Sequence, residues 1–251
     1  MKKILIIGHS HVFALRRANK NMEIDGADSF EVDFLEMQNS RYSPNIVGPA
    51  PLELNPSLQS DLVEISKNTD FVVSCARGGE HNILGLLRHP KPFDFFLSES
   101  PDRSIEREAS LIPEGLVSDR LRMTTKMLRI YLHKLRELIP SKIPILQLES
   151  PPPIPSVNHI MKYKGAYSER MDELGISPKN LRYKLWRVYG NLVSEYCNEC
   201  GVQYIKVPKL AQDSEGFLVE EAWNNDPTHG NEYYGKLALE NLFNNYIGDW
   251  K

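Results

Sequence analysis

Short runs of apolar residues, spread along the chain, constrain its fold more than any other feature of the sequence. Five runs rich in Ile, Val, Leu or Phe are each bounded by Gly, Pro, Ser or Asn, and they cover residues 3–8, 30–37, 71–76, 143–149 and 202–207. Runs of this length and composition predict β-strands. Because several are apolar at consecutive positions, we expect both faces of these strands to be covered, as in a parallel sheet between helices.

Patterns typical of amphipathic helices separate the predicted strands. They cover residues 11–22, 57–67, 119–138, 180–199 and 232–246. In the third pattern, steps of three and four residues place a mostly apolar stripe on one helix face, formed by Leu121, Thr125, Leu128, Leu132, Leu135 and Ile139. The alternation of strands and helices predicts an α/β protein, a doubly wound layered sandwich with right-handed crossovers.

The size and charge of the chain indicate an ordinary globular protein. Its 251 residues, 41% of them hydrophobic, are enough to bury a core without disulfides or metal, so we expect one domain over 1–251. A formal net charge of −3 gives no electrostatic attraction to phosphate backbones or anionic membranes. Nucleic-acid and membrane partners are therefore not expected.

The cysteine content and the apolar runs indicate the compartment. Three cysteines are too few, and odd in number, for a disulfide framework, which favours a reducing environment. The apolar run that begins the chain ends at Gly8, short of the ~7–15 residues of a signal-peptide core. No apolar stretch approaches the ~20 residues that span a bilayer, so we expect a cytoplasmic protein.

Two irregular segments interrupt the alternation of strands and helices. Residues 87–118 contain four prolines and an aromatic cluster, and residues 150–178 begin with a proline-rich stretch directly after the fourth predicted strand. Long loops at the carboxyl ends of α/β strands commonly build the functional site. Both segments are therefore candidate walls or lids of a site.

The sequence Gly8-His9-Ser10-His11 lies where the first strand ends and a helix begins. There Ser10 would stand at the positive end of a helix dipole, where an alkoxide or anionic intermediate is stabilised. This placement suits a nucleophile. Serine is also a favoured helix N-cap, so a purely structural role is the alternative for Ser10.

A second group of polar residues, 225–230, precedes the last predicted helix. Asp226 lies three residues ahead of His229 across a turn that contains Pro227. This spacing lets a carboxylate accept the Nδ1–H of the imidazole and leaves Nε2 free to act as a base. The alternative is that Asp226 caps the turn and His229 is an ordinary surface residue.

A serine after the first strand and an Asp-x-x-His near the end of the chain resemble the SGNH (GDSL-like) hydrolase superfamily, over residues 4 to about 246. The resemblance implies a flavodoxin-like three-layer α/β/α sandwich with a five-stranded parallel sheet. It also implies that Ser10 is the nucleophile, His229 the base and Asp226 the orienter of that base. Gly8-His9-Ser10 departs from the usual Gly-Asp-Ser. An α/β-hydrolase elbow is excluded because Val12 stands where its second glycine would be.

The groups that would bind an oxyanion are ambiguous in the sequence. The family has Gly-x-Asn-Asp after the third strand, whereas this chain has Arg-Gly-Gly-Glu-His-Asn at 77–82. One register leaves only the Gly79 N–H in the position of the asparagine, and the other makes the Asn82 side chain the donor. We favour Asn82 together with the Ser10 N–H, with His81 as a substitute. No glycine follows the second strand directly, since the nearest is Gly48.

The histidines allow two interpretations. His9, His11 and His81 are expected to line the mouth of a hydrolase site and contact substrate. Together with Asp226 and His229 they could instead hold a transition metal. We favour the first interpretation, with no metal and no cofactor, because His9 and His11 flank Ser10 and need not converge.

The sequence therefore predicts a serine ester hydrolase that acts on a small acyl ester. By resemblance, O-acetylated carbohydrates are the favoured substrate class. An acyltransferase that uses Ser10, or a ligand-binding protein without activity, are the alternatives. Cys197 and Cys200 are expected to pack at a helix end. A solvated helix face is expected for the basic residues Lys179, Arg182, Lys184 and Arg187.

Overall fold

Five parallel strands form the central sheet of the protein. The structure, a computed structural model, describes residues 1–248, so the last three positions of the domain expected over 1–251 lie outside the described residues. The strand order is β2-β1-β5-β8-β9, and the strands are β1 (Lys2–Gly8), β2 (Phe30–Glu36), β5 (Phe71–Cys75), β8 (Ile145–Leu148) and β9 (Gln203–Ile205). Each of the five predicted strands is present, and the α/β class with a five-stranded parallel sheet is confirmed.

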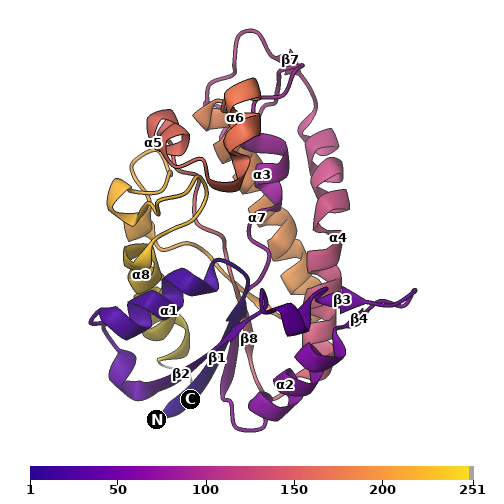
Figure 1. Ribbon diagram of the computed structural model, residues 1–251, viewed down its shortest axis with the longest axis vertical. Coiled ribbons are helices and arrows are strands. Elements are labelled where there is room, and N and C mark those ends of the chain that lie inside the picture. The colour runs from indigo at the N-terminus through magenta and orange to yellow at the C-terminus, as the bar shows by residue number, and fades with distance from the viewer. Residues whose placement is uncertain (249–251) are drawn as a thin grey trace.

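Helices cover both faces of this sheet (Figure 1). The longer ones are α1 (Val12–Asn21), α2 (Pro56–Ser66), α4 (Glu114–Leu138), α7 (Lys179–Cys200) and α8 (Glu232–Leu242), which a π-helix, η6 (Phe243–Ile247), continues. Helices α1 and α8 pack together on one side, and α2, α4 and α7 lie on the other (Figure 1). Within residues 1–248, no helix is both long and apolar enough to cross a membrane.

The first strand shows how the apolar runs make a double-sided core. Successive side chains of a strand point to opposite faces of the sheet. Ile4 and Ile6 pack into the hydrophobic cluster under α1 and α8. Leu5 and Ile7 pack into the cluster under α4 and α7. All four are at most 2% exposed, which explains why this run is apolar at consecutive positions.

Local sequence signals fix several helix ends. Asn55 caps α2 by accepting hydrogen bonds from the N–H groups of the next turn, and Asn231 does the same for α8. Helix α7 ends at Cys200 and is capped by Gly201, whose φ of 69° lies in the left-handed region that glycine adopts most easily. Cys197 is fully buried near this end, as expected from its helix position.

Short elements occupy the connections. Two small sheets pair β3 (Ile46–Val47) with β4 (Glu53–Leu54), and β6 (Phe93–Asp94) with β7 (Ser110–Leu111). Short helices are α3 (Glu80–Gly85), α5 (Val157–Lys162), α6 (Ser168–Leu174) and the 3₁₀ turns η1 (Ala27–Ser29), η2 (Ser40–Tyr42), η3 (Gly165–Tyr167), η4 (Lys209–Ala211) and η5 (Glu220–Ala222). The two irregular segments thus contain local structure that their proline-rich sequences do not indicate.

Two cations of α7 are buried, which corrects the expectation of a solvated basic face. Arg182 is 2% exposed and Lys184 is fully buried. The Arg182 guanidinium donates to the backbone carbonyls of Ile154, Pro155 and Ser177, all of which belong to the segment 150–178. A buried cation of this kind needs such acceptors to offset its lost hydration. This helix face is therefore the anchor of a long connection.

Lys184 holds the other irregular segment, 87–118, against α7. Its ammonium forms an ion pair of 2.5 Å with Asp94, which is 2% exposed, and donates to the carbonyl of Phe95 at 3.0 Å. Asp94 also accepts hydrogen bonds from the backbone N–H groups of Phe95 and Glu106. Both charges are thus compensated inside the protein. Arg182 and Lys184, which were expected to be solvated, therefore connect the segments 150–178 and 87–118 to the same core helix, α7.

Candidate active site

Ser10 occupies the turn between β1 and α1. Strand β1 ends at Gly8 and helix α1 begins at Val12, with His11 as its N-cap residue. No side chain caps this helix end, so Ser10 does not act as the cap. Instead, its Oγ lies 2.6 Å from Nε2 of His229. The expected contact between the two ends of the chain is present in the structure.

The turn after Trp223 orients His229 through Asp226. One carboxylate oxygen of Asp226 lies 3.0 Å from Nδ1 of His229 and accepts the backbone N–H groups of Thr228 and His229 at 2.9 and 2.8 Å. The other oxygen accepts Nδ2–H of Asn224 at 2.6 Å. With its Nδ1–H donated to this carboxylate, His229 directs the Nε2 lone pair at Ser10.

The charge of Asp226 is stabilised by these donors. Burial alone would raise the pKa of its carboxyl group, but the hydrogen bond and charge of His229 and the two backbone N–H groups hold that pKa well below its ordinary value of 3.8. Asp226 is therefore ionised throughout the neutral range. It can orient the imidazole and stabilise an imidazolium.

Close packing of α1 and α8 sets the distance between Ser10 and His229. Ser10 lies two residues before α1, and His229 lies three residues before α8. A Cβ added to Gly235 of α8 would lie 2.2 Å from the backbone oxygen of Ala14 in α1, so only glycine permits this approach. The helix pair therefore acts as the rigid support of the two reactive groups.

His9 has a positioning role in the structure. Its Nε2 lies 2.7 Å from Oδ1 of Asn45, and its Nδ1 accepts the backbone N–H of Arg77 at 3.2 Å. Desolvation lowers the pKa of His9, opposed by the bond to Asn45 and reinforced by the charge of Arg77. Both ring nitrogens are occupied, so His9 joins the ends of β1 and β5, and its ring has no free nitrogen to offer a substrate.

His11 and His81 differ in their relation to Ser10. The ring of His11 packs on that of His229, with centroids 4.9 Å apart, and desolvation together with the neighbouring imidazoles lowers the pKa of His11 to about 3. His81 is only 4% exposed, and its ring packs against Tyr189. Burial lowers the pKa of His81 to about 3. This position corrects the expectation that His81 contacts substrate or donates to an oxyanion.

A hollow of about 400 Å³ opens beside Ser10 and His229. Its described lining comes from the turn after β1, the segment after β5, the turn before α8 and the 150–178 segment: His9, Ser10, His11, Arg77, Gly78, Gly79, Glu80, Asn82, Ile83, Tyr167, Thr228 and His229. Tyr167 makes the segment 150–178 a wall of the site, as expected. None of these described lining residues belongs to 87–118, so the structure does not support that segment as a wall.

The two candidate oxyanion donors differ in their bonding. The Gly79 N–H donates to the carbonyl of Arg77 at 2.8 Å, so it is already used. Gly79 has a φ of −114°, and a Cβ there would meet no atom within 4 Å, so this position does not require glycine. The Asn82 side chain lines the hollow and bonds to no other residue in 1–248. This geometry favours the Asn82 amide.

Three lining residues of the hollow, Arg77, Ile83 and Tyr167, have no functional role in the sequence-based prediction. Arg77 begins the motif at 77–82 and Tyr167 lies in the segment 150–178, but neither residue was singled out there. For Arg77 a signal existed, because it follows β5 and precedes two glycines at the edge of the sheet where Ser10 lies. Throughout residues 1–248, no three His, Cys, Asp or Glu side chains converge as metal ligands.

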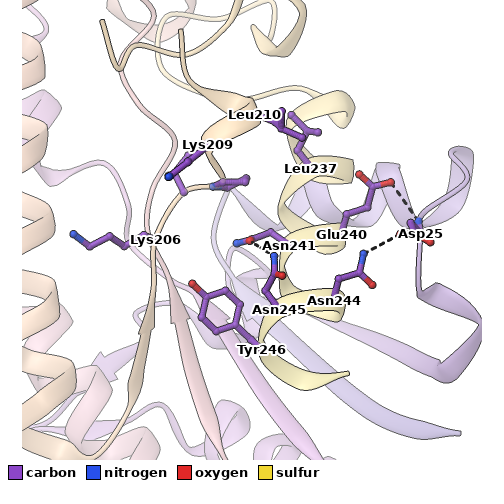
Figure 2. Close-up of a pocket in the computed structure, with 12 residues that line it drawn as sticks. Asp25, Lys206, Lys209, Leu210, Leu237, Glu240, Asn241, Asn244, Asn245 and Tyr246 are labelled. Carbon is purple, nitrogen blue, oxygen red and sulfur yellow. Dashed lines mark hydrogen bonds between the residues drawn. The ribbon is translucent and has the colours of Figure 1, made fainter. Parts of the chain in front are cut away.

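A larger hollow, of about 710 Å³, lies away from these residues (Figure 2). It runs between the chain after β9, with Lys206 and Lys209, and the outer side of α8 and η6. Several of its polar groups bond to each other, as Asn244 does to Asp25 (Figure 2). No serine, cysteine or histidine is among its described lining residues, so this hollow does not contain a serine–histidine or cysteine–histidine pair.

Comparisons with known proteins bear on the fold. No family model matches the sequence, and no curated protein matches it significantly. Among solved structures, the periplasmic domain of a lipopolysaccharide acetyltransferase from Salmonella serovar Paratyphi A is similar, with a TM-score of 0.50 and 14% identity over 98% of this chain and 84% of that one. The chain has the SGNH hydrolase fold.

Two further structures with lower scores are similar to this SGNH fold over most of their length. A carbohydrate acetylesterase from Sinorhizobium meliloti has a TM-score of 0.48 and 10% identity, with both chains fully covered. A GDSL-like lipase from Bacteroides thetaiotaomicron has a TM-score of 0.43 and 11% identity, over 98% of this chain and 88% of that one. At these identities the likeness concerns the fold, and the chemistry must be argued from the site itself.

Proposed function

We propose that this protein is a serine ester hydrolase in which Ser10 is the nucleophile, His229 the general base and Asp226 the orienter of that base. The observation that carries the proposal is the continuous line of hydrogen bonds from Asp226 through His229 to Ser10, at the wall of an open hollow. A nucleophile bonded to a base that a third group orients is the arrangement needed for acyl transfer.

In the first half of the reaction, Ser10 Oγ attacks the carbonyl carbon of the ester while His229 Nε2 takes the hydroxyl proton. The carbonyl electron pair moves onto oxygen and gives a tetrahedral oxyanion. When that pair returns, the bond to the alcohol oxygen breaks, and His229 gives its proton to the departing alcohol. The acyl group then remains on Ser10 as an ester.

The oxyanion requires donors placed before the reaction. The N–H of Ser10 lies close to the start of α1, where the helix dipole favours negative charge. The Asn82 amide, which has no protein partner within 1–248, is the second donor that we propose. Such contacts strengthen as the carbonyl oxygen becomes charged, so they lower the barrier more than they tighten substrate binding.

In the second half, water replaces the alcohol. His229 takes a proton from this water, whose oxygen attacks the acyl carbon, and a second tetrahedral oxyanion forms. Its collapse breaks the bond to Ser10 Oγ, which recovers its proton from His229. The hollow of about 400 Å³ suits a small ester. We propose small acyl esters as substrates, with O-acetylated carbohydrates as the first class to test.

The decisive experiment combines covalent labelling with turnover. A fluorophosphonate probe should label Ser10 of the wild type and leave Ser10→Ala and His229→Ala unlabelled, because only an activated serine reacts. Hydrolysis of 4-nitrophenyl acetate should be lost in the same two variants to a similar degree, since residues of one catalytic unit do not act additively. Ser60→Ala, on the exposed side of α2, is the matched control.

The possible outcomes separate the alternatives. A wild type that neither reacts with the probe nor hydrolyses any ester would overturn the proposal in favour of a binding protein. Acetate released in water identifies a hydrolase. Acetyl groups recovered on an added sugar, in place of free acetate, would instead identify a transferase that uses the same serine.

A further inference from the structure

The backbone of Arg77 is held firmly at the wall of the hollow. Its N–H donates to His9 Nδ1 at 3.2 Å, and its carbonyl accepts the Gly79 N–H at 2.8 Å and the Tyr189 hydroxyl at 3.1 Å. Its φ is 58°, the one left-handed value at a non-glycine position among the described residues. Such conformations are uncommon outside glycine, and they persist only where the surroundings impose them.

The guanidinium of Arg77 has more N–H donors than it uses in contacts with the described residues. Its side chain is 31% exposed and lines the same hollow as Ser10 and His229. A guanidinium has five N–H donors. Within residues 1–248 its one carboxylate contact is with Glu80, at 3.5 Å. Most of its hydrogen-bonding capacity is therefore not used by contacts among the described residues.

The carboxylates around the hollow neutralise this charge poorly. Glu80 is 8% exposed, and it also accepts the Tyr189 hydroxyl at 3.1 Å. Burial raises the pKa of the Glu80 carboxyl group, so the protein interior disfavours its negative charge. Asp226 already accepts hydrogen bonds from four donors. An anion that enters the hollow would find a cation without a strong partner.

We propose that Arg77 binds an oxyanion carried by the substrate, a carboxylate or a phosphate, beside the ester bond that Ser10 attacks. The planar fork of arginine matches both groups with two parallel hydrogen bonds. This inference rests on the proposed function and narrows its substrates to anionic esters. The fixed backbone of Arg77 makes the subsite part of the resting structure.

The test compares three esters of similar size. They are 3-acetoxybenzoate, 3-acetoxyphenyl phosphate and the neutral 3-acetoxybenzamide. The measured quantity is kcat/KM for each anion divided by that for the amide. In the wild type this ratio should exceed that of Arg77→Asn at least ~10-fold for one of the two anions, as expected for loss of a charge-assisted pair. The anion that shows the effect identifies the group bound.

The variants are chosen to keep the fold. Asparagine tolerates the left-handed conformation better than other residues that carry a side chain, so Arg77→Asn removes the charge with little strain. Arg77→Lys keeps the charge without the fork and should give an intermediate ratio. Arg41→Gln is the matched control, because Arg41 also has one carboxylate partner, Asp61, but lies outside the hollow.

Equal ratios in the wild type and Arg77→Asn, for both anions, would overturn the inference. If the ratios are equal but the wild type hydrolyses the neutral amide's ester and Ser10→Ala does not, the subsite is refuted while the proposed hydrolase function stands. If no ester is turned over, calorimetric titration of 3-acetoxybenzoate and 3-acetoxyphenyl phosphate decides. One of the two should bind Ser10→Ala at least ~10-fold more tightly than Ser10→Ala/Arg77→Asn, and equal affinities for both would refute the subsite.

Discussion

Burial of the His81 imidazole makes the stability of this protein depend on pH in a way that can be calculated. His81 is 4% exposed, its Nδ1 has no hydrogen-bond partner, and its pKa is lowered from 6.5 to about 3. The folded state thus resists protonation that the unfolded chain accepts freely. The resulting stability is fully present above pH 6.5 and declines as the pH falls toward the pKa of the folded state.

The size of the effect follows from the two pKa values. At pH 5 an unfolded imidazole with a pKa of 6.5 binds its proton almost completely, while His81 in the folded state stays neutral. Between pH 7 and pH 5 this difference removes about 2 kcal/mol of unfolding free energy. For a chain of this length the loss corresponds to a decrease of roughly 4–8 °C in Tm.

The variant His81→Phe isolates this contribution. Phenylalanine keeps an aromatic ring against Tyr189 but cannot bind a proton. Urea unfolding at pH 7 and pH 5, followed by tryptophan fluorescence, should show that the wild type loses about 2 kcal/mol more than His81→Phe over this range. His133→Gln, which removes an exposed histidine of α4, is the control for the loss of a histidine as such. Parallel losses in the wild type and His81→Phe would refute the reasoning.

Three further changes test other parts of the structure. In steady-state kinetics, Asn82→Ala should lower kcat by ~10²–10³ with little change in KM, and Gly79→Ala should lower kcat much less. A larger loss of kcat in Gly79→Ala than in Asn82→Ala would identify the backbone N–H as the oxyanion donor. Gly235→Ala places a Cβ against the carbonyl of Ala14, so it should reduce the free energy of unfolding by ~1–3 kcal/mol and should also reduce ester turnover. Unchanged stability in urea unfolding would count against the close approach of α1 and α8. Lys184→Met leaves a buried carboxylate unpaired and should cost ~3–5 kcal/mol by the same assay, whereas a loss below 1 kcal/mol would show that the pair is solvated.

The strands and the Ser10–His229 contact could be predicted because their signals are local or topological. An apolar run bounded by turn residues indicates a strand by itself. The contact joins positions 219 residues apart, yet it follows once each residue is assigned to a turn before a helix and the resemblance implies that both belong to one triad. The short helix α3 escaped prediction because six residues show no clear period.

The environment of single charged residues could not be predicted, because it depends on what the long connections do in space. Arg182 and Lys184 fall among other basic residues, and this sequence pattern is usual for an exposed face. Only the folded paths of 87–118 and 150–178 supply the carbonyls and the carboxylate that bury them. For the same reason, the burial of His81 and the open position of Arg77 are evident only in three dimensions.

The two buried cations of α7 also determine how the long connections open. A loop without such ties usually exchanges its amide hydrogens through small local fluctuations, independently of the core. Here an opening that released residues 154–155 or residue 94 would leave the charge of Arg182 or Lys184 buried without its partner. These parts should therefore separate only when α7 itself leaves the sheet. In deuterium exchange, the slowest amides of the segments 87–118 and 150–178 should exchange together with those of α7 as one cooperative unit. Their sequences, by contrast, are those of irregular connections.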